Sequence, residues 1–392
     1  MRLISYYLCF ILLVINVSCS YSEGSLTDGI ITIDMTEINT EKDGSLFFDS
    51  IYNPKVIPIG FNDNTIISQI ENLKMVDDRI YFIDKNTKSV HCCNKSGDLQ
   101  LTIKRLGRGP GEYSHLTDYC IHNNNIYILD RITQNIIVCC SSTGEYKNTI
   151  HLQESRNFSK IIVNQGSIFL SSQLSTRSQY AIYEFDFKGN LKNKALKFDP
   201  HYIQRLDEYE LNSTLHEIDG VVHYSLLMNN NIYEFNPNGI HVKYKFDFGN
   251  RDIETYINNS NSRNNFEYFE DGLNANDIIS LTGHMAESSN YLVSYFTKGS
   301  RMFILLYDKV NNTAKVYPNM MNGLYFLMGA NSPIHYLGDS TFATVLDPFN
   351  FCPLPEVEEL NGHSKNLCEV YHQIKEISPN VGDNAMIMLF NL

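Results

Sequence analysis

The 392-residue chain is poor in basic residues and contains no tryptophan. Its 31 Lys and Arg residues are outnumbered by 44 Asp and Glu residues, which gives a formal net charge of −13. Nonspecific binding to nucleic acid or anionic lipid requires a basic surface, so neither is expected as a partner. Charged residues make up only 19% of the chain and apolar residues 43%, which argues against wholesale disorder and permits a packed core. Tyrosine (25) and phenylalanine (22) are abundant and, with β-branched runs, favour strands.

Linear motifs of common enzyme and cofactor sites are also missing. The sequence has no GxxxxGK[ST] phosphate loop, no GxSxG elbow, no HExxH and no Ser-x-x-Lys. No CxxC pair or Cys/His spacing indicates zinc, and the 12 histidines are scattered, for example His223, His284 and His335. The sequence therefore predicts no catalytic residues, no metal and no cofactor, although histidines from different repeats could still converge in space.

The N-terminus is predicted to be a targeting segment. Arg2 precedes an apolar run of about a dozen residues, which is shorter than the roughly 20 needed for a comfortable membrane span. Residues 16–19 (Asn-Val-Ser-Cys) resemble a bacterial lipobox, with Asn16 where leucine is usual. We expect a signal peptide over residues 1–18 and lipidation of Cys19; an ordinary secretory signal is the alternative.

This assignment places the mature protein in the cell envelope. Residues 19–29 are interpreted as a lipid-anchored linker and residues 30–392 as one domain. The linker lacks an acidic cluster, which favours the periplasmic face over the outer surface. No later run is long and apolar enough to span a bilayer, so the lipid anchor is the only membrane attachment predicted.

Seven cysteines remain after Cys9 and Cys19 are assigned to the targeting segment. Five of them lie in strand-like runs and are expected to pack as small apolar residues: Cys92, Cys93, Cys120, Cys139 and Cys140. Export permits disulfides, and a bridge between Cys352 and Cys368 is left open.

An internal repeat organises the chain. Asp78–Asp84 and Asn124–Asp130 have similar sequences 46 residues apart. Each is followed by a β-rich run that ends in a double cysteine, by a glycine turn and by another apolar strand. Weaker copies begin near Ser167, Val221, Tyr291 and Ile334. A period in this range is typical of propellers and arrays.

Six units of about 57 residues, each long enough for four strands, predict an all-β fold: a six-bladed β-propeller with four-stranded blades. The last unit has only two clear strands before a helix-like stretch, residues 356–377. A C-terminal strand within residues 383–390 and the N-terminal runs Ile30–Ile33 and Lys55–Ile59 are expected to complete it. Strands from both termini would then close the ring.

One motif resembles a known family. Residues 107–113 (Gly-Arg-Gly-Pro-Gly-Glu-Tyr) are similar to the GxGPGEY signature of a family of exported bacterial lipoproteins with six-bladed β-propellers. Residues 383–387 resemble that family's C-terminal ending, with Ala385 replacing the usual proline. The resemblance implies export, lipidation and the propeller fold. It implies no reaction and no catalytic residues.

The same loop supplies the candidate ligand-binding residues. Arg108, Glu112, Tyr113 and His115 could line the mouth of the central channel, where an arginine suits carboxylate or sugar-acid ligands. The alternative is a connector between blades, with glycines providing unusual backbone angles and Glu112 capping backbone N–H groups. Acidic clusters at residues 207–210 and 267–271 are interpreted as solvated loops. Paired carboxylates for glycoside hydrolysis are the alternative for these clusters.

Two functions follow from these observations. The first is a non-enzymatic binding or scaffold module for a peptide, a protein or a glycan. The second is a propeller hydrolase or lyase that acts on saccharides, with its polar residues spread over several blades. The channel lining discriminates between them, because converging His, Arg, Tyr and carboxylate groups favour chemistry and an apolar plug favours simple binding.

Overall fold

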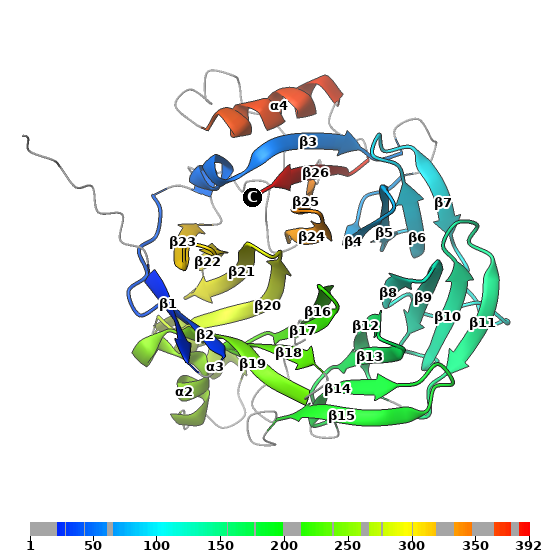
Figure 1. The fold of residues 1–392 in the computed structure, drawn as a ribbon, viewed down its shortest axis with the longest axis horizontal. Helices are drawn as coiled ribbons and strands as arrows, with labels where there is room; N and C mark the ends of the chain where they lie inside the picture. The colour runs from blue at the N-terminus through cyan, green and yellow to red at the C-terminus, as the bar shows by residue number, and fades with distance from the viewer. Residues whose placement is uncertain are drawn as a thin grey trace, which may run out of the picture.

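The computed structural model describes most of the chain. The described residues are 22–27, 29–42, 44–60, 66–154, 156–175, 178–198, 213–236, 239–259, 266–275, 277–299, 301–318, 333–346, 364–377 and 384–392. Six antiparallel blades are arranged as a ring around a central axis (Figure 1). The predicted fold class is confirmed.

The first three blades follow one another along the chain, each with its first strand nearest the axis (Figure 1). Blade one contains β4 (Ile70–Val76), β5 (Arg79–Asp84), β6 (Ser89–Cys93) and β7 (Leu99–Ile103). Blade two contains β8 (Asp118–His122), β9 (Asn125–Asp130), β10 (Asn135–Cys140) and β11 (Tyr146–His151). Blade three contains β12 (Phe158–Asn164), β13 (Ser167–Ser172), β14 (Tyr180–Phe185) and β15 (Leu191–Lys197).

Blades four and five are joined by the N-terminal hairpin. Blade four contains β16 (Ser213–Ile218), β17 (Val221–Leu226), β18 (Asn231–Asn236) and β19 (Gly239–Asp247). Blade five contains β20 (Ile279–Glu287), β21 (Tyr291–Lys298), β22 (Arg301–Asp308) and β23 (Thr313–Pro318). Strand β2 (Ile30–Asp34) pairs in parallel with β19, and β1 (Ser22–Thr27) pairs with both β2 and β23.

This hairpin departs from two sequence-based expectations. The run Ile30–Ile33 was expected to help close the ring, but it forms β2 at the outer edge of blade four. Its parallel pairing gives the exposed N–H and C=O groups of β19 partners, which removes a free sheet edge. Residues 22–27, within the segment interpreted as a linker, form β1.

Blade six closes the ring with strands from both ends of the chain. It contains β24 (His335–Gly338), β25 (Thr341–Leu346), β26 (Met386–Asn391) and β3 (Tyr52–Pro58), in that order from the axis outward. The register pairs Ile387 with Ile57 and with Val345. Closure by the C-terminal strand and by the Lys55–Ile59 run is therefore confirmed.

Apolar packing between neighbouring blades forms the core. Because neighbouring blades cover both faces of each blade, its central strands are buried at successive positions, as in β5 and β6. The adjacent residues Cys92 and Cys93 point to opposite faces and join different apolar clusters. Cys92, Cys93, Cys120 and Cys139 are buried free thiols, in keeping with their predicted packing role.

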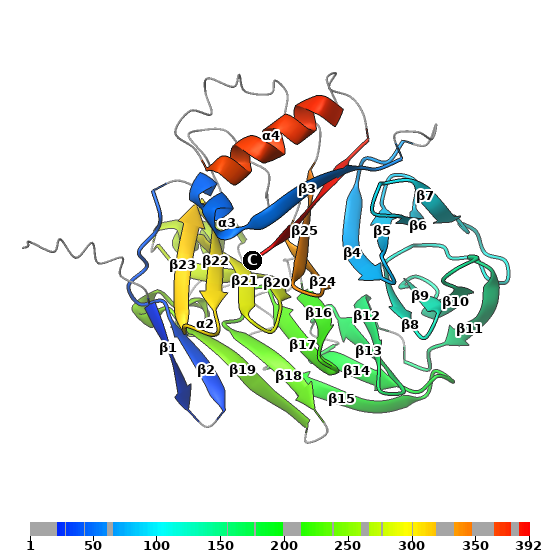
Figure 2. The same ribbon diagram turned by 45° about the horizontal axis from the view of Figure 1, so that its top comes forward.

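Helical segments lie outside the ring of blades. The 3-10 helix η1 (Gly44–Ser50) and helix α4 (Lys365–Ile377) cover blade six (Figure 2), where Leu367, Val370 and Ile374 enter its core. The segment between blades four and five includes the acidic cluster at residues 267–271, which was expected to lie in a loop. It contains η2 (Gly249–Arg251), α2 (Ile253–Asn259) and α3 (Phe266–Ala275), and Ile253 and Ile257 anchor it to blade four. None of the helices within the described residues has the length and apolar character needed to cross a membrane.

Candidate functional site in the central channel

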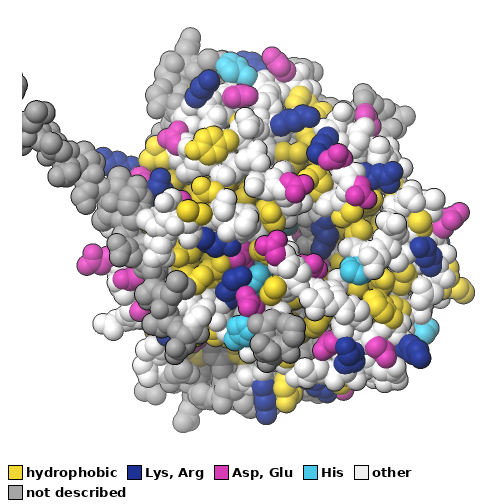
Figure 3. Space-filling model, in the orientation of Figure 1, with side chains coloured by type: hydrophobic (Ala, Val, Ile, Leu, Met, Phe, Trp, Pro, Cys, Tyr) yellow, Lys and Arg dark blue, Asp and Glu magenta, His cyan; other side chains and the backbone are white. Residues whose placement is uncertain are grey.

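The innermost strands of all six blades surround a polar cavity on the ring axis. Its volume is about 1280 Å³, and its walls include residues of β4, β8, β12, β16, β20 and β24. Figure 3 shows Lys, Arg, Asp, Glu and His side chains gathered around the hollow at the centre of one face. The channel therefore offers space and polar groups to a ligand.

β-Bulges shape the walls of this cavity. Strand β4 shifts register between Glu71 and Lys74, and β12 shifts between Phe158 and Lys160. Strand β20 shifts between Leu281 and Met285, a stretch that includes His284. A bulge turns a side chain away from its regular alternation and is often found beside functional sites. Each of these three register shifts includes or adjoins a lysine or histidine of the channel wall.

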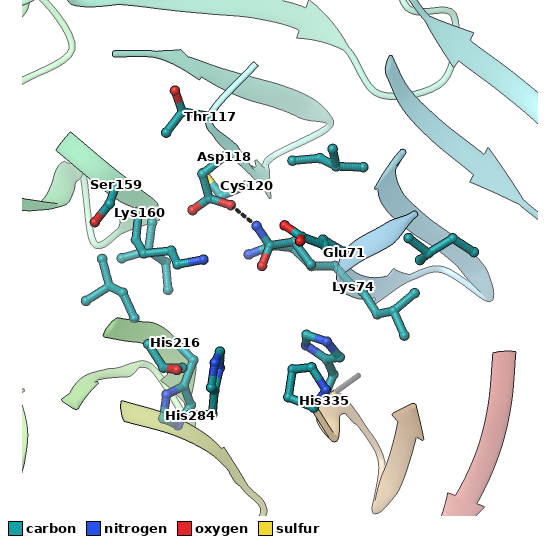
Figure 4. A pocket seen from close by; sticks show the side chains of 18 of the residues that line it. Glu71, Lys74, Thr117, Asp118, Cys120, Ser159, Lys160, His216, His284 and His335 are labelled. Carbon is teal, nitrogen blue, oxygen red and sulfur yellow. Dashed lines mark hydrogen bonds between the residues drawn. The ribbon is translucent and has the colours of Figure 1, made fainter. Parts of the chain in front are cut away.

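Two lysine side chains enter the cavity from blades one and three. Figure 4 shows Lys74 and Lys160 extending into the space below Asp118. Within the described residues, neither ammonium group has a carboxylate oxygen within 4.0 Å, whereas the nearby Glu71 is paired with Lys85 at 2.6 Å. The Lys74 Nζ lies 5.6 Å from the centre of the Tyr119 ring. Lys74 and Lys160 thus offer ammonium groups that no described carboxylate pairs with. The cations Lys88 and Arg131, likewise unpaired among the described residues, also line the cavity.

Three histidines line the cavity on the side away from Asp118, His216 on β16, His284 on β20 and His335 on β24 (Figure 4). Burial, and then the Lys160 charge, lower the pKa of His284 to about 4. Burial lowers the pKa of His335 to about 3, with further contributions from His284, Lys160 and Lys74. The imidazoles of His284 and His335 are therefore neutral near pH 7 and can donate or accept a hydrogen bond.

Asp118 connects three neighbouring blades at the channel wall through hydrogen bonds. The Asn72 side-chain amide donates to its Oδ1, and the backbone N–H of Ile161 donates to its Oδ2 at 2.8 Å. Asn72 adopts a left-handed backbone with φ of 54° in the β4 bulge, which asparagine tolerates better than most residues. Burial raises the pKa of Asp118, and the charges of Lys160 and Lys74 oppose this shift. This carboxylate ties blades one, two and three together.

The loop that carries the sequence candidates is largely self-contained. The backbone N–H of Gly109 donates to Glu112 Oε2 at 2.7 Å, so Glu112 caps its own loop. Tyr113 is fully buried, and its hydroxyl donates to the carbonyl oxygen of Lys88 at 2.7 Å. Arg108 is exposed. These contacts are those expected of a blade connector.

His115, the fourth candidate, is placed differently from the other three. It lies among the residues that line the central cavity. Burial and the Arg131 charge lower its pKa, so its imidazole too favours the neutral form. The loop therefore contributes to the channel through His115.

Other sequence-based expectations fall outside the described residues. These are lipidation of Cys19, the acidic cluster at residues 207–210 and the Cys352 half of the possible disulfide. In the second acidic cluster, residues 267–271 belong to α3, which replaces the expected loop.

Sequence reasoning did not identify Lys74 or Lys160. Both lie in the first strand of a repeat, where a strand at the ring axis carries polar groups among apolar ones. A polar residue within an otherwise apolar first strand was the sequence signal that could have indicated these channel residues. For His284, the preceding Gly283 was a further signal, because a glycine inside a strand often marks a bulge. Which polar side chains point inward depends on bulges, and these follow from three-dimensional pairing.

Comparison with known proteins places the chain in a family. Residues 30–391 match a family described as "Domain of unknown function (DUF4934)". The chain belongs to this family. A search of curated proteins gives no match.

Solved structures agree on the fold. A candidate exported protein from Bacteroides fragilis NCTC 9343 is similar, with a TM-score of 0.69 and 17% identity over 93% of this chain and 99% of that chain. A member of the DUF4221 family from Bacteroides vulgatus ATCC 8482 has a TM-score of 0.53 and 9% identity, covering 87% of this chain and 98% of that chain. At these identities the similarity concerns the fold alone.

Proposed function

We propose that this DUF4934 protein is an exported binding propeller whose central channel captures a ligand that carries a carboxylate. The ligand classes that fit are an acidic glycan and an acidic peptide. The observation that carries the proposal is the pair of channel lysines, Lys74 and Lys160, which bulged inner strands direct into one cavity. An ammonium group in a partly enclosed cavity forms a stronger hydrogen bond to a carboxylate than it does on an open surface.

Neutral histidines complement this role. His284 and His335 add hydrogen-bonding capacity without adding positive charge, so they suit the hydroxyl groups of a sugar or the amides of a peptide. A cavity of about 1280 Å³ exceeds the range of typical small-molecule pockets, which supports an oligomeric ligand. The cavity lining contains five Lys and Arg side chains and three Asp and Glu side chains, so its charge balance is positive in a chain with a net charge of −13, which favours acidic ligands at the axis.

Calorimetric titration tests the proposal. Purified protein is titrated with oligogalacturonate, a neutral oligosaccharide of equal length and an acidic peptide. We expect binding of one acidic ligand class, weakened at least tenfold in Lys74→Met and in Lys160→Met, because each loses about 1.5 kcal/mol or more of charge-assisted bonding. Lys104→Met, at an exposed position after β7, is the matched control and should bind as the wild type does. Equal affinity for neutral and acidic saccharides would refute the role of the lysines.

A saccharide lyase is the second candidate. The observation in its favour is a neutral histidine, His284, whose pKa is lowered to about 4 near the Lys160 ammonium group. In such a β-elimination a lysine neutralises the uronate carboxylate, the neutral imidazole removes the adjacent proton, the glycosidic C–O bond breaks, and the departing oxygen takes a proton from the imidazolium or from water. An imidazole with a pKa of about 4 is a weak base, which places the lyase second to the binder. Glycoside hydrolysis receives less support, because both oxygens of Asp118 accept hydrogen bonds and Glu71 is paired with Lys85. Among the described residues this leaves Glu217 as the one lining carboxylate that is not engaged, whereas the reaction requires two. Incubation with oligogalacturonate and ultraviolet detection of an unsaturated product distinguish the lyase from the binder.

Export and lipid anchoring at Cys19 complete the proposal. The lipobox-like residues 16–19 support anchoring, and the exported description of the Bacteroides fragilis relative supports export. The periplasmic face is favoured because the segment after Cys19 lacks an acidic cluster.

A further inference from the structure

A second polar cluster lies between blades four and five. His216 on β16 and His223 on β17 are directly opposite each other in the strand register. Glu287 ends β20 of the next blade, with its side chain 0% exposed, and the His223 side chain is 1% exposed. A fully buried carboxylate beside two histidines needs a physical reason, because burial of a charge is costly unless it is compensated.

Among the described residues, hydrogen bonds compensate one of the two carboxylate oxygens of Glu287. Its Oε1 accepts from the Tyr244 hydroxyl at 2.6 Å and from Lys309 Nζ at 2.8 Å. Its Oε2 is buried and has no hydrogen-bond partner within the described part of the chain. This oxygen lies 3.8 Å from His216 Nε2 and 3.6 Å from His223 Nδ1, beyond hydrogen-bond distance.

The two imidazole nitrogens that face this oxygen, His216 Nε2 and His223 Nδ1, are also buried without a hydrogen bond within the described part of the chain. Three potential ligand atoms from three strands thus face one another, all within 4.8 Å. Unsatisfied buried polar atoms each cost about 1–3 kcal/mol, so their concentration at one point indicates a missing common partner.

A divalent cation satisfies all three atoms. Zinc bonds to His nitrogen and carboxylate oxygen are about 2.0–2.2 Å long, which puts tetrahedral ligand atoms about 3.3 Å apart. The separations of 3.6 and 3.8 Å approach this geometry within about half an ångström. Two histidines and one glutamate form a known zinc ligand set that leaves a fourth position open. We propose that His216, His223 and Glu287 bind one Zn²⁺ ion at the seam between blades four and five.

The surroundings supply the supporting contacts that such a site requires. Tyr244 and Lys309 fix the carboxylate of Glu287 through Oε1 and leave Oε2 for the ion. Glu234 Oε2 lies 3.5 Å from His223 Nε2, close to the position of a carboxylate that orients a metal-bound imidazole. His216 also lines the central cavity, so the ion is adjacent to the channel.

Two ammonium groups near the site oppose the ion: Lys309 donates to Glu287 Oε1 at 2.8 Å, and Lys243 Nζ lies 3.6 Å from that oxygen. Lys243 is also close to an imidazole. Its Nζ lies 3.0 Å from His223 Nε2, an arrangement in which the lysine donates and the imidazole proton is on Nδ1. Binding of Zn²⁺ through Nδ1 requires the other tautomer, with the Nε2 proton directed to Glu234. Lys243 can stay paired with Glu234, whose Oε2 is 3.3 Å from Nζ. The ammonium group therefore lowers metal affinity without blocking the site.

Zinc titration of the metal-stripped full-length protein tests this inference. We expect one Zn²⁺ per chain by equilibrium dialysis and elemental analysis. His216→Ala should weaken the dissociation constant at least tenfold, because it removes one of three ligands. His122→Ala, a change in another partly buried histidine on an inner strand, is the matched control and should leave the constant unchanged.

A second variant moves the affinity the other way. Lys243→Met should tighten Zn²⁺ binding, and misfolding cannot produce a gain of this kind. Absence of stoichiometric binding, or equal affinity in wild type and His216→Ala, overturns the site. Weaker or unchanged affinity in Lys243→Met overturns the assigned geometry. Titration of oligogalacturonate into metal-free protein is a separate measurement, so the channel proposal and the zinc proposal can fail independently.

Discussion

Neutral histidines in the channel make the stability of the propeller depend on pH. The folded state holds the pKa of His284 at about 4 and that of His335 at about 3, compared with an ordinary value of 6.5. As the pH falls below 6.5, the unfolded chain takes up protons at these residues and the folded chain does not. The free energy of unfolding therefore falls between pH 6.5 and about 4. Between pH 7.5 and 5, each histidine accounts for a loss of about 2 kcal/mol.

Urea unfolding at pH 7.5 and at pH 5 measures this loss. His335→Asn and His284→Asn should each lose about 2 kcal/mol less than the wild type over this pH interval. Comparison with the wild type is essential, because Asp118, whose pKa burial raises, contributes with the opposite sign. His372→Asn, at an exposed position of α4, controls for loss of an imidazole. Identical pH dependence in all four proteins would refute the assignment of neutral channel histidines.

Three further changes test ring closure and anchoring. Gly97 has φ of 88°, and a Cβ there would lie 1.7 Å from the Pro58 carbonyl oxygen, so Gly97→Ala should cost about 2–4 kcal/mol in chemical denaturation; a loss below 0.5 kcal/mol would contradict this tight contact. Deletion from Ala385 onward removes β26 and should abolish cooperative thermal unfolding, whereas a sharp, unchanged transition would contradict closure by this strand. Cys19→Ala should release the protein from the membrane fraction, and persistence there would count against the lipid anchor.

The blades could be predicted because each repeat carries its own local signals. Apolar strands that alternate with Asx and glycine turns specify hairpins, and the similarity of residues 78–84 to residues 124–130 reveals the period. Blade six was predicted because the last repeat contains only two clear strands, which require two partner strands from the chain termini. Whether Lys55–Ile59 or Ile30–Ile33 pairs with the C-terminal strand depends on contacts between residues far apart in the chain, which the local sequence pattern does not encode.

The candidate sites could not be predicted for the same reason. His216 and His223 are seven positions apart, a spacing that suggests nothing until the hairpin register sets them opposite each other. Glu287 joins them from another blade. Similarly, Lys74 and Lys160 face one cavity only once blades one and three pack around the axis. The prominent GPGEY motif drew attention to Arg108, Glu112 and Tyr113, yet the contacts of Glu112 and Tyr113 hold the loop itself in place.

Closure of blade six imposes an order on folding. Strand β3 pairs with β26 across more than 300 residues, for example Ile57 with Ile387. Blades one to three consist of consecutive strands and can form from local contacts, whereas β3 must wait until the C-terminal residues are available. Until blade six is complete, the faces of blades one and five that pack against it are uncovered, and the apolar residues on these faces are exposed to solvent. We therefore expect chain completion to be the slow and aggregation-sensitive step of folding.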